Sequence, residues 1–415
     1  MSKKIPQKFT KGSILPIQMQ QIQLPVFVEK IFNGQKYVRY GDDNLFPQFL
    51  QMLANRSALH NAIITTKLDY AYGKGFDYEP TDKDVLTTAF INHPNPYESL
   101  QDIYKKVLYD YILYGAFSLN IIWDADGEHI AEVYHCDTAK LRSGMKDRFG
   151  RVDEYYYADT WYKTINRNYE SIKSFNPKNR KGGQILYYKQ YRPGVDYYAL
   201  PSYCGCLNSI ATDVEISNFH LSHILNGMSP SKMITFMDGV PSEEEERDLK
   251  LQIEELYTGS DNAGKFILNF VDTPEKAPKI DTLGGDNLGD EFIQLEDSVL
   301  NQILAGHKIT SPLLVGLRSE NNGLGSNADE IYNAYQVFVN NVIKPIQDEV
   351  LKVFNEILPY TKGYEGVTLA GTLNTPIEFT YSEQTLTQIC TKNELRERIG
   401  LDPIEEVIAE ENKNE

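Results

Sequence analysis

Apolar residues recur at helical spacing over much of the chain, and short β-rich runs separate the helical stretches. A helix that buries one face carries apolar residues three and four positions apart, whereas a half-buried strand alternates apolar and polar residues. The combination predicts an α+β fold. The pattern predicts helices within residues 47–73 and over residues 100–114, 207–228, 243–257, 290–305 and 327–358, and strands over residues 117–123, 152–157, 184–191, 233–236 and 265–271.

Two of the predicted helices carry signals at particular residues. Ser242 precedes an acidic run from Glu243 to Glu246, and Glu245 completes a capping-box pattern three residues after the serine. The run therefore indicates the first turn of a capped helix, where the helix dipole favours negative charge. Pro345 lies inside the last and longest helix. Because proline lacks a backbone N–H and clashes with the preceding turn, we expect a kink there.

The charge of the chain restricts its partners. Its 415 residues include 41 Lys and Arg against 58 Asp and Glu, which gives a formal net charge of -17. Tight, sequence-independent binding of nucleic acid requires Lys and Arg to displace the counterions of phosphate, so this charge argues against a protein that wraps DNA. It is compatible with DNA passing nearby, because a surface that repels phosphate adheres to it weakly.

Composition also indicates the compartment. No stretch is apolar over the roughly 18 residues that a bilayer-spanning helix needs, and the N-terminus lacks the apolar core of a signal peptide. Four cysteines are too few for a disulfide framework in a chain of this length. We therefore expect a soluble protein, made in a reducing cytoplasm, without a membrane partner.

One cluster of residues is compatible with an enzyme. Cys204 and Cys206 precede a predicted helix on which His220 and His223 are three residues apart, so both histidines could face one metal ion. A zinc-dependent hydrolase built on these four residues is thus an alternative hypothesis. The Cys-x-Cys spacing differs from the usual Cys-x2-Cys loop of zinc sites, and no phosphate-binding loop is evident. We expect neither a cofactor nor catalysis.

The second half of the chain holds an ordered series of short motifs. They are NGMSP at 226–230, a strand at 232–236, YTG at 257–259, NAGK at 262–265, FIQLE at 292–296, ITSPLL at 309–314, the long helix that opens at Asn327, and NELRERIGLDP at 393–403. In this order the motifs resemble the portal proteins of tailed bacteriophages, specifically those of long-tailed phages with lambdoid-type capsids. The resemblance covers most of residues 40–405.

The resemblance implies an architecture, a portal fold with an α/β wing, a helical stem, a small α/β clip and a long kinked helix. Family members form rings, usually dodecamers, through which double-stranded DNA passes. The implied division is an N-terminal arm at 1–39, the wing at 40–206, stem helices at 207–229 and 286–308 with the clip at 230–285 between them, a tunnel loop at 309–325, the long wing and crown helix at 326–358, and a C-terminal crown-side region at 359–415.

It also implies partners and sites. The clip would dock the large subunit of a separate, ATP-driven terminase and later a head-completion adaptor, while the ring would contact the major capsid and scaffold proteins. The chain itself would catalyse nothing, would be made in the host bacterial cytoplasm and would reside in the virion at the portal vertex. The clip-docking residues would be Glu243, Glu244, Glu245, Glu246 and Lys250. The loop facing DNA would comprise Lys308, Ile309, Thr310, Ser311, Pro312, Leu313, Leu314, Val315, Gly316, Leu317 and Arg318.

The centre of this loop, residues 313–317, is apolar and must be covered by other protein surface. Exposed apolar patches usually mark contact surfaces, so in a ring neighbouring loops would cover one another, although a loop buried within its own chain would explain the pattern equally well. By the same reasoning, the helices would bury their apolar stripes mainly against copies of the chain around an axis. A monomeric binding module or adaptor without a channel is the third hypothesis.

Overall fold

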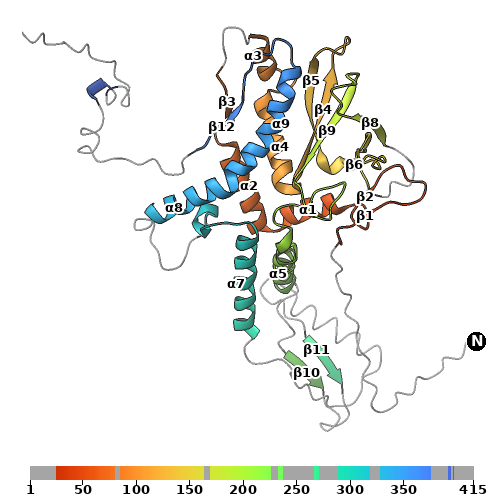
Figure 1. Cartoon of the computed structure of the whole chain (residues 1–415). Coiled ribbons are helices and arrows are strands. Elements are labelled where there is room, and N and C mark those ends of the chain that lie inside the picture. The colour runs from red at the N-terminus through yellow and green to blue at the C-terminus, as the bar shows by residue number, and fades with distance from the viewer. Residues whose placement is uncertain are drawn as a thin grey trace, which may run out of the picture.

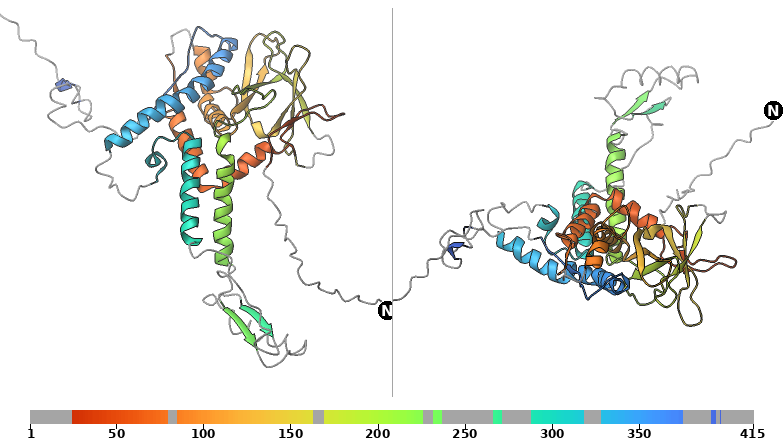
Figure 2. Two further views of the ribbon diagram at one scale, coloured as in Figure 1. Left: turned by 60° about the horizontal axis from the view of Figure 1, so that its bottom comes forward. Right: turned by 90° about the horizontal axis from the view of Figure 1, so that it is seen from above.

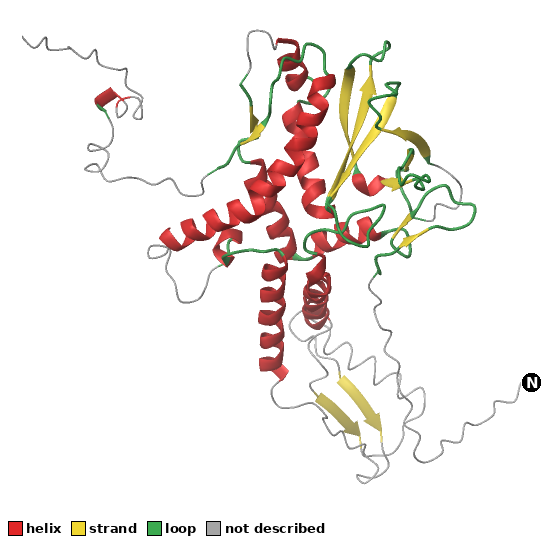
Figure 3. Ribbon diagram, viewed as in Figure 1, coloured by secondary structure: helices red, strands yellow, loops and turns green. Residues whose placement is uncertain are grey.

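The computed structural model shows a body of helices and β-sheet from which two helices project (Figure 1). Helices gather on one side of the body and a six-stranded sheet on the other (Figure 3). This mixed architecture confirms the expected α+β fold. The structure describes residues 25–79, 85–162, 169–225, 232–236, 266–270, 288–317, 328–374, 391–393 and 396.

Helix α4, Leu100–Tyr114, lies at the centre of the body and packs against helices and sheet. Ser99 caps its N-terminus: the Ser99 hydroxyl accepts a hydrogen bond from the Asp102 N–H, and the Asp102 carboxylate accepts one from the Ser99 N–H. Gly115 ends the helix with a φ of 75°, a left-handed conformation that glycine adopts without strain. The helix predicted over 100–114 is confirmed.

A break at Ser57 divides the first predicted helix into two. Helix α1, Phe46–Arg56, ends there and α2, Ala58–Tyr72, begins. Ser57 has extended backbone angles, and its hydroxyl accepts a hydrogen bond from the His60 N–H at 3.0 Å, which caps α2. The helical pattern predicted within residues 47–73 thus forms two helices, because a single serine caps the second although no proline or glycine lies beside it.

The sheet of the body has the strand order β5-β4-β9-β8-β7-β6. Its neighbouring strands run antiparallel except for β8 and β9, which run parallel. Three of these strands, β4, β7 and β9, confirm the strands predicted from alternation in this region. The strands are β4 Ala116–Trp123, β5 Ile130–Cys136, β6 Leu141–Ser143, β7 Glu154–Tyr157, β8 Glu170–Ser174 and β9 Gly183–Lys189.

The segment from residue 25 to residue 39 folds onto its own chain. Strand β1, Glu29–Lys30, pairs antiparallel with β2, Arg39–Tyr40. The Glu29 carboxylate accepts hydrogen bonds from the N–H groups of Tyr197 and Tyr198 at 2.8 and 2.7 Å. Within the predicted arm at 1–39, the described residues 25–39 therefore contact their own chain; the rest of the arm lies outside the described residues.

The long C-terminal helix contains a π-helical segment. Helix α8, Ala328–Phe338, continues through the π-helical residues Val339–Ile343 into α9, Lys344–Ile357. Pro345 is the second residue after the π segment. Wider π-type turns occur where the regular i→i−4 bonding is interrupted, as it is by a proline without an N–H. The structure thus places a distortion one turn before the residue at which a kink was predicted.

Helices of the body bury their apolar faces within the single chain. One large cluster joins α1, α2, α4 and α9 to the sheet, and Leu50, Ile64, Leu108 and Phe354 are fully buried in it. The expectation that apolar stripes pack mainly against other copies is therefore wrong for the body. The remaining elements are β3 Phe76–Asp77, α3 Val85–Asn92, η1 Thr138–Lys140, η2 Cys204–Cys206, η4 Pro312–Val315, η6 Leu358–Tyr360 and β12 Ala370–Gly371.

Two helices leave the body side by side, α5, Leu207–Leu225, and α7, Leu288–Gly306 (Figure 2). We call them the stem pair. Strands β10, Lys232–Phe236, and β11, Phe266–Phe270, form a parallel pair beyond its far end (Figure 1). The helices predicted at 207–228 and 290–305 and the two strands between them are confirmed, whereas the helix predicted at 243–257 lies outside the described residues.

Candidate functional site

The stem pair is antiparallel and is held by polar contacts along its length. Near the body, the Ser209 hydroxyl at the start of α5 donates to the Gln302 carbonyl oxygen near the end of α7, at 2.6 Å. Further out, His220 Nε2 lies 2.9 Å from the Glu296 carboxylate. The chain therefore leaves the body along α5 and returns along α7.

Neither of the two stem helices contains a Lys or an Arg residue. They carry six carboxylates, which are Asp213, Glu215, Asp290, Glu291, Glu296 and Asp297. A strongly acidic pair of helices in an acidic chain gives a surface that repels polyanions, since the summed field of like charges extends beyond single contacts.

The stem pair also exposes large apolar side chains. Leu221 on α5 is 56% exposed, and Ile293 and Leu295 on α7 are 59% and 43% exposed. Nearer the body the same helices bury Val214 and Ile303. Exposed apolar side chains that cluster on one element usually mark a contact with another molecule.

Short-range packing fixes the base of the stem pair on the body. The Ser57 hydroxyl, between α1 and α2, donates to the Asp213 carboxylate of α5 at 2.6 Å. Gly306, at the end of α7, lies so close to Cys206 that a Cβ there would approach the cysteine Sγ to 2.3 Å. Glycine is therefore required for the close approach of α7 to the start of α5.

The predicted tunnel loop begins with residues that pack on their own chain. The Thr310 hydroxyl donates to the Ala334 carbonyl oxygen of α8 at 2.7 Å, and the Ser311 hydroxyl accepts from the Leu313 N–H. Leu314 is buried, and Ile309 packs against the core. The apolar centre of the loop is therefore partly covered within the chain, as the hypothesis of a buried loop required. Arg318 and the rest of the loop lie outside the described residues.

Buried basic groups meet where the stem pair joins α2, a feature that the sequence analysis missed. His307 Nε2 lies 2.9 Å from His60 Nδ1, and the Lys67 ammonium lies 3.2 Å from His307 Nδ1. The Tyr203 ring stacks on His307 at 4.6 Å. Burial lowers the pKa of His60 to about 3 and that of Lys67 to about 7, and it also lowers the pKa of His307. We call this group the junction cluster.

The sequence carries only a weak signal for the junction cluster. His60 and Lys67 are seven residues apart in the predicted helix, which places them on one face. His307 follows them by 240 residues or more, so only the fold brings it to that face.

The structure does not gather the proposed zinc ligands. Cys204 accepts a contact from Arg192, Cys206 is buried against α7, and His220 pairs with Glu296. About 14 helical residues, or roughly 21 Å, separate Cys206 from His220. The side chain of His223 lies outside the described residues, and within the described part of the chain no three His, Cys, Asp or Glu side chains are placed to hold one metal ion.

The clip-docking residues Glu243–246 and Lys250 also lie outside the described residues. Among the helices that the structure describes, none combines the length and the apolar character that crossing a bilayer demands.

The fold is shared with chains of gene transfer agent particles. A chain of the virion of a native gene transfer agent particle aligns with a TM-score of 0.53 at 14% identity, covering 86% of this chain and 94% of that one. A chain of the neck of the native particle, computed with C12 symmetry, aligns with a TM-score of 0.51 at 14% identity, covering 86% and 95%. At this identity the similarity shows the fold alone.

The sequence assigns the family. Residues 57–400 match the phage portal protein family, and the chain belongs to it. A probable portal protein of Haemophilus phage HP1 (strain HP1c1) is 22% identical over 175 residues, 41% of this chain and 48% of that protein. An uncharacterized protein of Rickettsia bellii (strain RML369-C) is 24% identical over 233 residues, 56% of each chain. The chain thus spans about half the length of the curated relatives it matches.

Proposed function

We propose that the chain is one subunit of a ring, a dodecamer, that forms the DNA channel at the portal vertex of a phage-like virion. DNA enters through the ring during packaging and leaves through it during ejection. The observation that carries this function is the stem pair, which combines six carboxylates, no Lys or Arg, and exposed apolar side chains. Family membership and the fold shared with particle necks support it.

The charge and the apolar groups of the stem pair have different roles in this function. Copies arranged around an axis would cover the apolar side chains Leu221, Ile293 and Leu295 against one another, because a stable interface needs an apolar core. Carboxylates such as Glu215 and Asp297, both exposed, would repel the phosphates of DNA and keep it from adhering to the wall.

Other parts of the chain would supply the partners' docking surfaces. Glu243–246 and Lys250 would belong to the clip that binds the terminase large subunit and later a head-completion adaptor. Residues 309–325 would form the loop facing DNA, with Lys308 and Arg318 flanking its apolar tip. Capsid and scaffold proteins would hold the ring in place, and the terminase rather than this chain would hydrolyse ATP.

Particle mass and shape test the ring directly. Mass photometry and negative-stain imaging of the purified full chain should show rings of about a dozen subunits. Leu221→Asp and Ile293→Asp should disperse the rings without unfolding the subunits. Met145→Asp, which changes an apolar residue of the body that is 48% exposed, should leave them intact. A chain that remains a single copy at high concentration would refute the proposal.

DNA packaging tests the channel. Glu215→Lys with Asp297→Lys should slow packaging, because the new ammonium groups attract phosphate, while Asp126→Lys in the turn between β4 and β5 should have little effect. The loop is tested separately by Lys308→Ala with Arg318→Ala. If that pair changes neither the packaging rate nor DNA retention, Lys308 and Arg318 do not contact the phosphates of DNA.

A further inference from the structure

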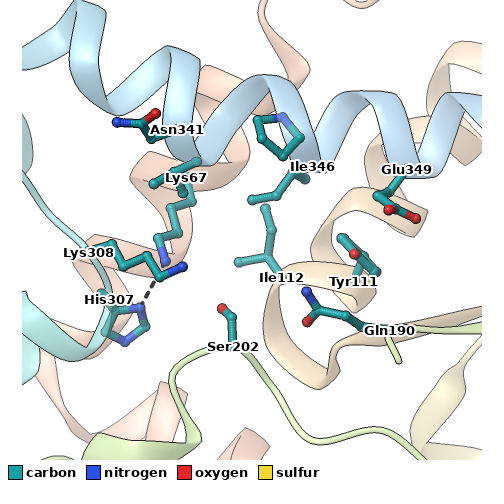
Figure 4. Close-up of a pocket in the computed structure, with 12 residues that line it drawn as sticks. Lys67, Tyr111, Ile112, Gln190, Ser202, His307, Lys308, Asn341, Ile346 and Glu349 are labelled. Carbon is teal, nitrogen blue, oxygen red and sulfur yellow. Dashed lines mark hydrogen bonds between the residues drawn. The ribbon is translucent and has the colours of Figure 1, made fainter. Parts of the chain in front are cut away.

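A polar cavity of about 170 Å³ lies between the junction cluster and the long C-terminal helix. Its lining comes from α2, α4, the end of α7, the π-helical segment and α9. Figure 4 shows Lys67, His307 and the end of Lys308 on one side of this cavity, with Ser202 and Gln190 across from them. The space exceeds that of a single water molecule, for which roughly 10–15 Å³ suffices.

Lys67 reaches the cavity with unused donors. Its side chain is 3% exposed, and an ammonium group has three N–H donors. Only one acceptor is present for it among the described residues, His307 Nδ1 at 3.2 Å. With Nδ1 accepting, His307 Nε2 carries the proton and donates to His60 Nδ1 at 2.9 Å, so His60 Nε2 in turn carries a proton. That last buried nitrogen has no partner among the described residues.

The charges around Lys67 do not balance it. Burial has the largest effect on the pKa of Lys67 and lowers it. Of the neighbouring groups, Cys206 raises this pKa and Lys308, whose charge has the same sign as that of Lys67, lowers it. The carboxylate that lines the cavity, Glu349, accepts a hydrogen bond from the Tyr188 hydroxyl. A buried ammonium without a paired counter-ion is strongly unfavourable. Among the described residues no carboxylate, Glu349 included, forms an ion pair with Lys67, so this ammonium lacks an anionic partner.

Lys308 enters the cavity lining from a strained backbone. Its φ is 59°, in the left-handed region that glycine usually occupies after a helix. The Lys308 N–H donates to the Ala305 carbonyl oxygen and the Ile309 N–H to that of Leu304, so the turn closes α7 as a glycine would close it. A lysine at this position is less stable than a glycine because of its positive φ, and it brings a second ammonium group into the lining of the cavity that Lys67 reaches.

We propose that this cavity binds one small oxyanion of the phosphate or sulfate type. Lys67 and Lys308 supply positive charge, and the Ser202 hydroxyl and the Gln190 amide supply neutral hydrogen-bond donors from the opposite side of the cavity. Lysine binds such anions as a compact point charge. A bound anion would link α2, the end of the stem pair and the long helix at one point. This inference stands independently of the ring and the channel.

Calorimetric titration with sulfate tests the site, because sulfate takes up no proton near neutral pH. We expect sulfate to bind the full chain and chloride at equal ionic strength not to bind. The affinity should fall by about tenfold to a hundredfold in Lys67→Met and in Lys308→Gly, the range for one charge-assisted hydrogen bond. Lys352→Gln, which changes an exposed lysine of α9, should bind sulfate like the parent chain.

Proton uptake separates this site from general salt effects. Because burial holds the pKa of Lys67 near 7, a bound anion should raise it, and titrations at pH 8 in buffers of different ionisation enthalpy should show uptake of up to about one proton. Lys67→Met should abolish the uptake. If that variant does not fold, Lys308→Gly still decides the matter. Relief of the backbone strain should raise its melting temperature, while a given sulfate concentration should stabilise it less than it stabilises the parent chain.

Two results would overturn the proposal. One is sulfate and phosphate binding that persists unchanged in Lys308→Gly. The other is a parent chain that is stabilised equally by chloride, or by acetate but not by sulfate, which would indicate a general salt effect or a carboxylate site.

Discussion

Gly306→Ala offers a sharp test of how the stem pair is seated on the body. A Cβ at residue 306 would lie 2.3 Å from the Sγ and 2.6 Å from the Cβ of Cys206. The Sγ could rotate away, but the cysteine Cβ moves only with the backbone of η2. The substitution therefore pushes the end of α7 away from the start of α5.

Two opposing effects set the magnitude. Alanine is favoured over glycine within a helix by up to about 1 kcal/mol, although less at its last residue. Overpacking of a tight contact destabilises by roughly 1–3 kcal/mol. We expect the clash to prevail and the free energy of unfolding to fall by about 1–2 kcal/mol.

Urea unfolding of the full chain at one fixed protein concentration measures the loss, and a double-mutant cycle assigns it. Cys206→Gly removes both close atoms and leaves the Cα of residue 206 at 3.8 Å from the new methyl group, an ordinary contact. Gly306→Ala should then be at least about 1 kcal/mol less harmful in the Cys206→Gly background. Equal losses in both backgrounds, or a more stable single variant, would refute this account of the contact.

Three further predictions concern the body. Burial holds the pKa of His60 at about 3 against an ordinary 6.5, so below pH 6.5 the unfolded chain binds a proton that the folded chain does not. As the pH is lowered below 6.5, this group should reduce the free energy of unfolding by about 1.4 kcal/mol per pH unit. Urea unfolding of His60→Gln at several pH values should show a shallower dependence on pH, and an unchanged dependence would count against the burial. Ser57→Ala removes the cap of α2 and the bond to Asp213, which should lower the free energy of unfolding by about 1–2 kcal/mol; Ser57→Thr, which retains the hydroxyl, should lose less, and equal losses would exclude a hydroxyl effect. Gly115→Ala forces a φ of 75° on alanine and brings its Cβ within 2.8 Å of the Leu200 carbonyl oxygen, so a loss of about 1–3 kcal/mol is expected; a neutral result in thermal melts would show that the turn can shift.

Part of the candidate site could be predicted from the sequence. The stem helices and the strands between them followed from apolar spacing, and their acidic character can be counted residue by residue. Their exposed apolar side chains could not be identified in this way, because spacing alone does not tell an apolar stripe that faces the core from one that faces outward. Leu221 and Val214 lie on the same helix, yet one is 56% exposed and the other 4%.

The sequence by itself determined the local features of this protein. The cap at Ser99, the left-handed glycine at 115 and the helix between them depend on residues a few positions apart, so they can be found in the sequence before the fold is known. The order of its short motifs likewise resembles that of portal proteins, to whose family the chain belongs.

Only the tertiary structure decided which distant residues meet. Lys67 and His307 are 240 positions apart, and no spacing rule connects them. Cys206 and His220, much closer in sequence, are held apart by the rigid rise of α5. Contacts of this kind depend on how whole helices pack, which is set by the summed burial of many side chains rather than by any local pattern.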